Sequence, residues 1–165
     1  MADARRLSRF HARGGGWVVV QSVLMGAVFA SGVWRHGNWT GLPGILVGAG
    51  FLVAGGYAGI AGVVVLGRNR TPFPKPRAGS ELVRRGIYAH VRHPLYTSVL
   101  LTSLGWALVW QSGPAIVATL VLIPFFLLKA RREERWLRER FPEYADYERS
   151  VPRFIPRIRR APKPV

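Results

Sequence analysis

The segment around Arg92, His93 and Pro94 holds the residue types of this chain best suited to binding an anionic group. Proline is favoured at the first position of a helix, so Pro94 predicts a helix start with His93 as its cap. The first amides of a helix have no intrahelical partner, and the helix dipole adds positive charge there. With a guanidinium and an imidazole beside them, these amides suit a carboxylate or a phosphate. Alternatively, Arg92 and His93 only anchor a membrane span at the membrane surface.

Two adjacent carboxylates, Glu133 and Glu134, are the second group that could do chemistry. Leu137 follows at helical spacing, so both carboxylates are expected on or beside the apolar face of a helix, where acidic groups need partners. The pair would suit the ammonium group or vicinal hydroxyls of a ligand. A ligand with these groups and a carboxylate is an amino-acid nucleoside. The structural alternative is an ion-pair lock with one of three arginines: Arg92, Arg131 or Arg138.

Long uncharged segments predict the elements that hold these groups. The 165 residues are 49% hydrophobic, yet the formal net charge is +16, so apolar and charged residues are segregated along the chain. About 20 apolar residues cross a bilayer as a helix. We therefore predict an all-α integral membrane bundle, a single domain of residues 1–165, with a cytoplasmic C-terminal helical extension. Its four transmembrane helices are expected at residues 17–34, 42–66, 94–111 and 114–128.

The distribution of basic residues predicts the orientation of this bundle. The segment before the first span, the loop between the second and third spans, and the tail contain 4, 7 and 12 Lys or Arg, and the other two loops contain Arg35 alone. Basic segments stay in the cytoplasm, so both termini are expected there. This pattern explains the charge without a nucleic-acid partner. Arginine outnumbers lysine 21 to 3, which indicates a GC-rich bacterial genome and hence the bacterial inner (plasma) membrane.

Local patterns predict how the helices pack and connect. The span at 42–66 carries a stripe of small residues, which lets another helix approach closely within the chain or in a homodimer. The stripe consists of Gly44, Gly48, Gly55 and Gly59. Residues 81–91 are expected to form a short surface helix, bent near Gly86. The chain has no cysteine, which excludes disulfides and thiolate nucleophiles, and no metal is expected.

Two longer motifs contain the residues named above. The first is Leu82-Val83-x-x-Gly86-x-Tyr88-x-x-x-Arg92-His93-Pro94-x-Tyr96. The second is Glu133-Glu134-x-x-Leu137-x-x-x-Phe141-x-x-Tyr144-x-x-Tyr147-x-x-x-Val151-Pro152-x-x-Ile155-Pro156. In this order they resemble the isoprenylcysteine carboxyl methyltransferases and related phospholipid methyltransferases, over about residues 71–158. Ile87, Ser98 and Pro142 depart from the usual family pattern, but no charged group is lost.

The resemblance implies a membrane enzyme that uses S-adenosylmethionine. It implies an in-line transfer of methyl to a lipophilic acceptor at the cytoplasmic membrane face, with the cofactor region at about 82–96 and 129–156. The implied catalytic residues are Arg92, His93 and Tyr96. The implied cofactor-binding residues are Tyr88, His93, Pro94, Leu95, Glu133, Glu134, Tyr144 and Tyr147. An isoprenylcysteine-like carboxylate, a phospholipid headgroup and a small lipophile all remain open as acceptors, with O-, N- or S-methylation.

Two other classes of function are alternatives to a methyltransferase. Membrane reductases that use NADPH have a related architecture, but a paired glutamate disfavours a 2′-phosphate. A non-enzymatic scaffold would grip anionic lipid headgroups through its basic tail, at about 1 kcal/mol for each basic residue near the surface. The tail residues suited to anionic lipid are Arg149, Arg153, Arg157, Arg159, Arg160 and Lys163.

Overall fold

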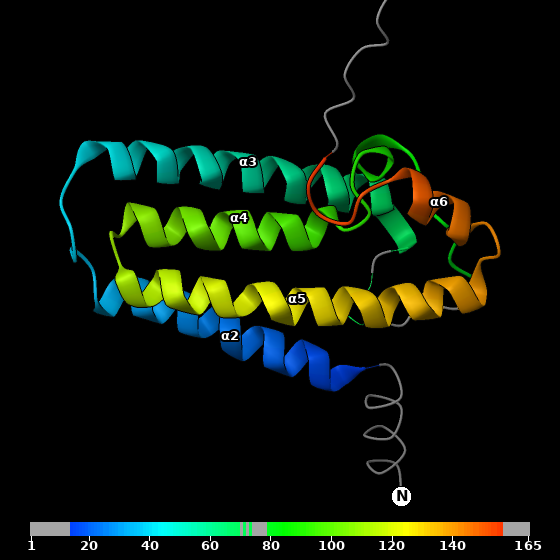
Figure 1. Cartoon of the computed structure of the whole chain (residues 1–165), viewed down its shortest axis with the longest axis horizontal. Coiled ribbons are helices and arrows are strands. Elements are labelled where there is room, and N and C mark those ends of the chain that lie inside the picture. The colour runs from blue at the N-terminus through cyan, green and yellow to red at the C-terminus, as the bar shows by residue number, and fades with distance from the viewer. Residues whose placement is uncertain (1–13, 70, 72, 74–78, 157–165) are drawn as a thin grey trace, which may run out of the picture.

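The described part of the chain is a bundle of helices. The computed structural model describes residues 14–69, 71, 73 and 79–156. Its helices are α2 (Gly15–Trp34), α3 (Leu42–Leu66), α4 (Pro94–Val109), α5 (Gly113–Arg140) and α6 (Tyr144–Ser150), with 3₁₀ turns η1 (Gly67–Asn69) and η2 (Gly86–Ala89). Figure 1 shows α3 beside α4 and α2 beside α5, while α6 and η2 lie together at one end. The predicted all-α class is confirmed.

Three of these helices have the length and composition of membrane spans. They are α2, α5 and α3 together with its continuation to Asn69. The fourth apolar helix, α4, has 16 residues and is shorter than about 20, so the predicted count of four spans stays a prediction. Large apolar side chains such as Val53, Tyr57 and Val64 are more than 70% exposed on α3, a surface that suits lipid rather than water.

Helix α5 combines a predicted span and its charged extension in one continuous element. It begins with Pro114 in its first turn, passes through Pro124 and ends at Arg140, shortly before Pro142. The residue before a proline is disfavoured in the α region, and Phe141 before Pro142 is extended, which explains the end. The helix therefore carries Glu133 and Glu134 beyond its apolar segment, toward the end of the bundle where α4 begins.

Glycines on α3 allow α4 to approach closely. A Cβ built on Gly48 would lie 2.9 Å from the carbonyl oxygen of Gly105, and one on Gly55 would lie 2.7 Å from the Thr102 methyl. At the same seam, Ser98 Oγ donates a 2.6 Å hydrogen bond to the carbonyl oxygen of Gly55. The predicted glycine stripe thus packs within the chain at Gly48, Gly55 and Gly59, whereas Gly44 faces Trp39. A homodimer is not needed to explain it.

The predicted surface helix at 81–91 is wrong. Within this segment only the 3₁₀ turn η2 is helical. Gly86 has φ of +58°, a left-handed conformation outside the α-helical region that glycine adopts readily. A Cβ at Gly86 would also lie 2.8 Å from the Val65 side chain, so this glycine lets the loop approach α3. The loop consequently folds over the end of α3 and carries Tyr88 into the site.

Candidate cofactor pocket

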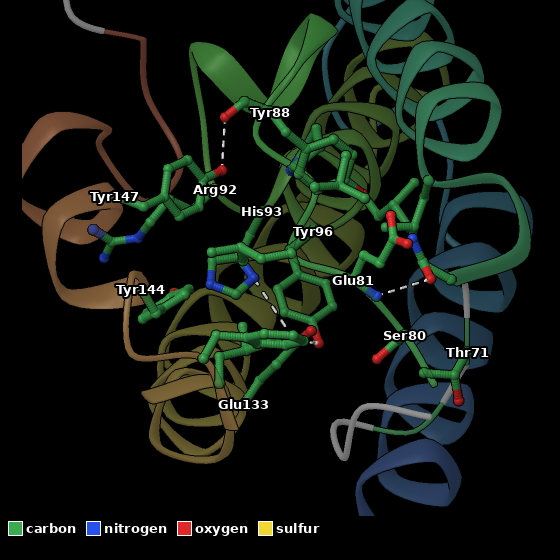
Figure 2. Close-up of a pocket in the computed structure, with 18 residues that line it drawn as sticks. Thr71, Ser80, Glu81, Tyr88, Arg92, His93, Tyr96, Glu133, Tyr144 and Tyr147 are labelled. Carbon is green, nitrogen blue, oxygen red and sulfur yellow. Dashed lines mark hydrogen bonds and ion pairs between the residues drawn. The ribbon is translucent and has the colours of Figure 1, made fainter. Parts of the chain in front are cut away.

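A pocket opens at the end of the bundle where α4 begins and α5 projects beyond it. Its wall is formed by the end of α3, the loop that follows, the start of α4, and the α5–α6 region. Figure 2 shows Tyr144 and Tyr147 on one side, Thr71, Ser80 and Glu81 on the opposite side, and His93, Tyr96 and Glu133 between them. The lining residues predicted from the sequence are Tyr88, Arg92, His93, Pro94, Leu95, Tyr96, Glu133, Tyr144 and Tyr147.

The start of α4 has the predicted form, with His93 as the N-cap and Pro94 at the first helical position. The tail crosses this point and is bonded to it. The Arg92 N–H donates to the Pro152 carbonyl oxygen at 2.9 Å, and the His93 N–H donates to the Arg153 carbonyl oxygen at 3.1 Å. These bonds place the tail over the cap, where the Arg153 side chain reaches the buried carboxylate described next.

Glu134 is the centre of an ion cluster outside the pocket lining. Its side chain is fully buried and receives hydrogen bonds from three residues. Arg92 Nη2 and His93 Nε2 lie 2.9 and 3.0 Å from Glu134 Oε1, and Arg153 Nη2 lies 2.5 Å from Oε2. Both carboxylate oxygens are therefore engaged by the protein itself. Of the partners predicted for an ion-pair lock, Arg92 is present, whereas the second arginine is Arg153.

Arg92 is engaged along its whole guanidinium. Nε donates to Glu134 Oε1 at 3.2 Å, and Nη1 donates to the carbonyl oxygens of Glu148 and Val151 at 2.6 and 2.9 Å. Nη2 bonds Glu134 and lies 3.5 Å from the Glu148 carboxylate. These five contacts match the five N–H donors of a guanidinium. Arg92 thus joins α4, α5 and α6 into one unit at the edge of the pocket.

Glu133 and Tyr96 form the polar pair that faces the pocket. The Tyr96 hydroxyl donates to Glu133 Oε2 at 2.6 Å, and the Tyr96 ring stacks on His93 with centroids 5.1 Å apart. Behind this ring lies Lys129, only 2% exposed, with its ammonium 5.2 Å from the ring centroid and hydrogen-bonded to Gln21 of α2. The charge pattern alone placed Lys129 at the start of a charged extension and gave no sign of its burial.

The tyrosines of the pocket differ in how their hydroxyls are satisfied. Tyr147 donates to the Tyr88 carbonyl oxygen at 2.6 Å, whereas the buried Tyr144 hydroxyl has no partner among the described residues. Burial raises the pKa of Tyr147 to about 12. Burial, followed by the charge of Glu134, raises the pKa of Tyr144 well above its usual range. Both phenols are therefore protonated donors at neutral pH, and that of Tyr144 is not used by the described residues.

Sequence reasoning missed several residues around the pocket. Glu81 and Asn69 line it from the loop after α3 and belong to no charged pattern. Arg153 was assigned to lipid binding, yet it pairs with Glu134, and Arg149 pairs with Asp146. Arg153 lies between Pro152 and Ile155 of the second motif, and this position was the feature of the sequence that could have placed it near Glu134. The remaining tail residues, Arg157, Arg159, Arg160 and Lys163, lie outside the described residues.

Fold and pocket together describe a helical bundle with membrane-type helices and a pocket at one end. A family model described as phospholipid methyltransferase matches residues 43–144. The chain belongs to this family, which agrees with the predicted kinship to the isoprenylcysteine and phospholipid methyltransferases. No solved structure matches the chain significantly.

The relatives that match this chain are named for metal resistance or for methyl transfer. The chain is 34% identical over 161 residues to the cobalt-zinc-cadmium resistance protein CzcN of Cupriavidus metallidurans, covering 94% of this chain and 69% of that protein. It is 30% identical over 147 residues to the nickel-cobalt-cadmium resistance protein NccN of Alcaligenes xylosoxydans, covering 86% and 63%. It is 33% identical over 113 residues to the protein-S-isoprenylcysteine O-methyltransferase of Schizosaccharomyces pombe, covering 66% and 48%. The chain thus spans 48% to 69% of the length of these relatives.

Proposed function

We propose that this protein is a membrane-embedded methyltransferase that uses S-adenosylmethionine and acts on a lipophilic acceptor at the cytoplasmic face of the bacterial inner membrane, with both termini cytoplasmic. The observation that carries the proposal is the buried, unpartnered hydroxyl of Tyr144 in a pocket that also presents Glu133. An unsatisfied buried polar group is costly, and a ligand that bonds to it removes the cost. The family supports the choice of cofactor.

The pocket residues fit the chemical groups of S-adenosylmethionine. Glu133 and Glu81 would face its cationic groups or its vicinal hydroxyls, and the Tyr144 hydroxyl would bond to a polar group. The Leu95 N–H in the first turn of α4 suits its carboxylate, since Pro94 has no N–H and the N–H groups of Tyr96 and Thr97 donate to the His93 carbonyl oxygen. The ring of Tyr88 suits a sulfonium, because aromatic faces attract cations. When bound, the cofactor supplies a methyl group that is already activated.

The chain's own part in such a reaction is to position and to exclude water. An activated methyl group chiefly requires proximity and orientation, which are worth about 7–11 kcal/mol. The cluster of Glu134 fixes α4, α5 and the tail relative to one another around the pocket. The apolar residues Leu66, Leu82, Val83, Leu137 and Phe141 complete the wall and keep water from the reacting groups.

A link between this chain and metal resistance rests on the names of its relatives CzcN and NccN. Within the described residues, no three His, Cys, Asp or Glu side chains are grouped so that they could hold a metal ion. Methyl transfer is named by the family and by the isoprenylcysteine relatives. We propose methyl transfer, rather than metal binding, as the function of this pocket.

Cofactor choice is tested by thermal unfolding of the detergent-solubilised protein with S-adenosylmethionine, S-adenosylhomocysteine or NADPH. At 100 times its dissociation constant, a ligand stabilises the folded state by about 2.7 kcal/mol. We expect S-adenosylmethionine and S-adenosylhomocysteine to raise the melting temperature and NADPH to leave it unchanged. Stabilisation by NADPH alone would instead support a reductase.

Tyr144→Phe and Tyr147→Phe are expected to separate ligand binding from folding. The Tyr144 hydroxyl bonds to no described residue, so its loss should not lower the stability of the cofactor-free protein and should weaken cofactor binding about 3- to 10-fold, the value of one hydrogen bond. Loss of the Tyr147 hydroxyl breaks its bond to Tyr88 and should cost about 1 kcal/mol of stability. Calorimetry and thermal unfolding of both variants check this. Equal cofactor affinity in Tyr144→Phe and wild type would remove Tyr144 from the site.

A further inference from the structure

A second hollow lies between the start of α2 and the part of α5 where its apolar segment ends. This α2–α5 groove has a volume of about 600 Å³, and its described lining shares no residue with that of the cofactor pocket. Figure 1 shows α2 beside α5, with the start of α2 angled away from it. A groove of this size is within the range of sites that bind small molecules. It is therefore large enough to hold part of a lipid.

The walls of the α2–α5 groove are apolar and largely aromatic. Trp17 and Val20 come from α2, and Phe125 and Trp136 come from α5. The rings of Trp17 and Phe125 lie 5.6 Å apart between their centroids. Val20 is 47% exposed, so this wall is open toward the surroundings of the bundle. Tryptophan is enriched at the depth of lipid headgroups, so the groove is expected where headgroups and acyl chains meet.

Arg132 supplies the charge of the α2–α5 groove. Its guanidinium carbon lies 4.7 Å from the centroid of the Trp136 ring. Stacking on an aromatic ring orients the guanidinium and leaves its N–H groups to bind a phosphate. The positions one turn away on α5 are Leu128, Lys129, Arg135 and Trp136, none of them acidic. Within the described part of the chain, no carboxylate forms an ion pair with Arg132, so its charge is left for a ligand.

A polar contact joins the two helices just beyond the groove. Gln21 follows Trp17 by about one turn of α2, and Lys129 follows Phe125 by about one turn of α5. The Lys129 ammonium donates to the Gln21 side-chain oxygen and is only 2% exposed. A ligand in the groove would bridge α2 and α5 beside this contact. It would thereby hold the start of α2 against α5.

We propose that the α2–α5 groove binds one anionic phospholipid, with its phosphate at Arg132 and an acyl chain along Trp17, Val20 and Phe125. The phosphate complements the guanidinium, and an arginine–phosphate contact is a strong, charge-assisted one. The chain covers apolar walls that the described residues leave open. This lipid is a bound partner at a site of its own, and the proposal does not depend on the reaction in the cofactor pocket.

Other occupants complement the groove less well. Residues 1–13 precede it in the chain and carry four arginines and one aspartate, so Arg132 would repel them. A free phosphate would satisfy Arg132 but leave the aromatic walls uncovered. A zwitterionic lipid would bring a cation toward Arg131 and Arg135, which are exposed on the same helix. An anionic lipid satisfies both the charge and the walls.

Native mass spectrometry of the full chain in detergent tests the preference, with phosphatidylglycerol and phosphatidylcholine of equal chain length as probes. We expect one phosphatidylglycerol to bind at least about tenfold more tightly than phosphatidylcholine, the value of a charge-assisted contact. Arg132→Gln should remove this preference. Arg135→Gln makes the same charge change one turn further along α5, outside the described lining, and should keep it.

A second pair of variants tests the place of the acyl chain. A Cβ at Gly16, which lines the groove, would meet no atom within 4 Å, so Gly16→Phe should fill the groove and weaken binding of phosphatidylglycerol about tenfold or more. Gly26 is equally open on α2 but lies outside the groove lining, so Gly26→Phe should bind like wild type. Equal affinity of wild type for both lipids, or wild-type binding by Arg132→Gln and Gly16→Phe, would overturn the proposal. Displacement of the lipid by excess inorganic phosphate would also overturn it, in favour of a simple anion site.

Discussion

Glu134→Gln is expected to destabilise this protein by about 3–5 kcal/mol, because it leaves two arginines beside a site that has lost its charge. Arg92 and Arg153 both bond to Glu134, whose side chain has no exposed surface. The substitution keeps the shape of the side chain and replaces one of its acceptors with a donor. The N–H groups that now point at Glu134 would face an amide nitrogen or remain unpaired. Thermal unfolding of the cofactor-free protein in detergent measures the loss.

Two control variants distinguish this cluster from a ligand-binding role. Glu133→Gln should leave the stability within about 1 kcal/mol of wild type, since a partly exposed carboxylate loses little when its charge is removed. Arg153→Gln added to Glu134→Gln should recover part of the stability, because one uncompensated charge is gone. A Glu134→Gln protein with unchanged melting and weakened cofactor binding would contradict this account and place Glu134 in the ligand site.

Gly105→Ala is expected to force α3 away from α4 and to destabilise the bundle. The added Cβ would lie 2.7 Å from the Gly48 carbonyl oxygen and 2.8 Å from the Leu52 backbone nitrogen. Backbone atoms cannot rotate away as a side chain can, so the helices themselves would have to move. Overpacking of this kind costs about 1–3 kcal/mol or more. The yield of monodisperse protein and its melting temperature report the effect.

Gly50 and Gly56 provide matched controls on α3. A Cβ at either position meets no atom within 4 Å, so alanine there should leave the bundle intact. Alanine is also a better helix former than glycine by up to about 1 kcal/mol. Normal melting of Gly105→Ala would show that the two helices are not held at this distance.

Local patterns were sufficient to predict several parts of the site. Pro94 marked the start of α4 and His93 its cap because proline is restricted to the first turn of a helix. The spacing of Glu133 and Glu134 from Leu137 placed both carboxylates on the inner side of α5, and Glu134 is buried. The glycines of α3 indicated a close helix contact because small residues permit one. Each of these inferences depends on residues within one helix.

Other parts depend on the path of the chain in space and were not predictable in this way. The partners of Glu134 were sought among Arg92, Arg131 and Arg138, and Arg92 is one of them. The second arginine is Arg153, brought over the α4 cap by hydrogen bonds of the tail backbone. The burial of Lys129 arises from the position of α2, which supplies Gln21. The left-handed conformation of Gly86 replaced an expected helix with a turn.

We propose that the pocket beside Tyr144 and Glu133 binds S-adenosylmethionine. Calorimetric titration of S-adenosylmethionine into the detergent-purified protein tests it most directly, with His93→Ala as the variant that removes a lining side chain at the α4 cap. We predict one binding site with micromolar affinity in wild type and at least tenfold weaker binding in His93→Ala. A well-folded wild type that releases no heat with S-adenosylmethionine or S-adenosylhomocysteine, yet binds NADPH, would contradict the claim.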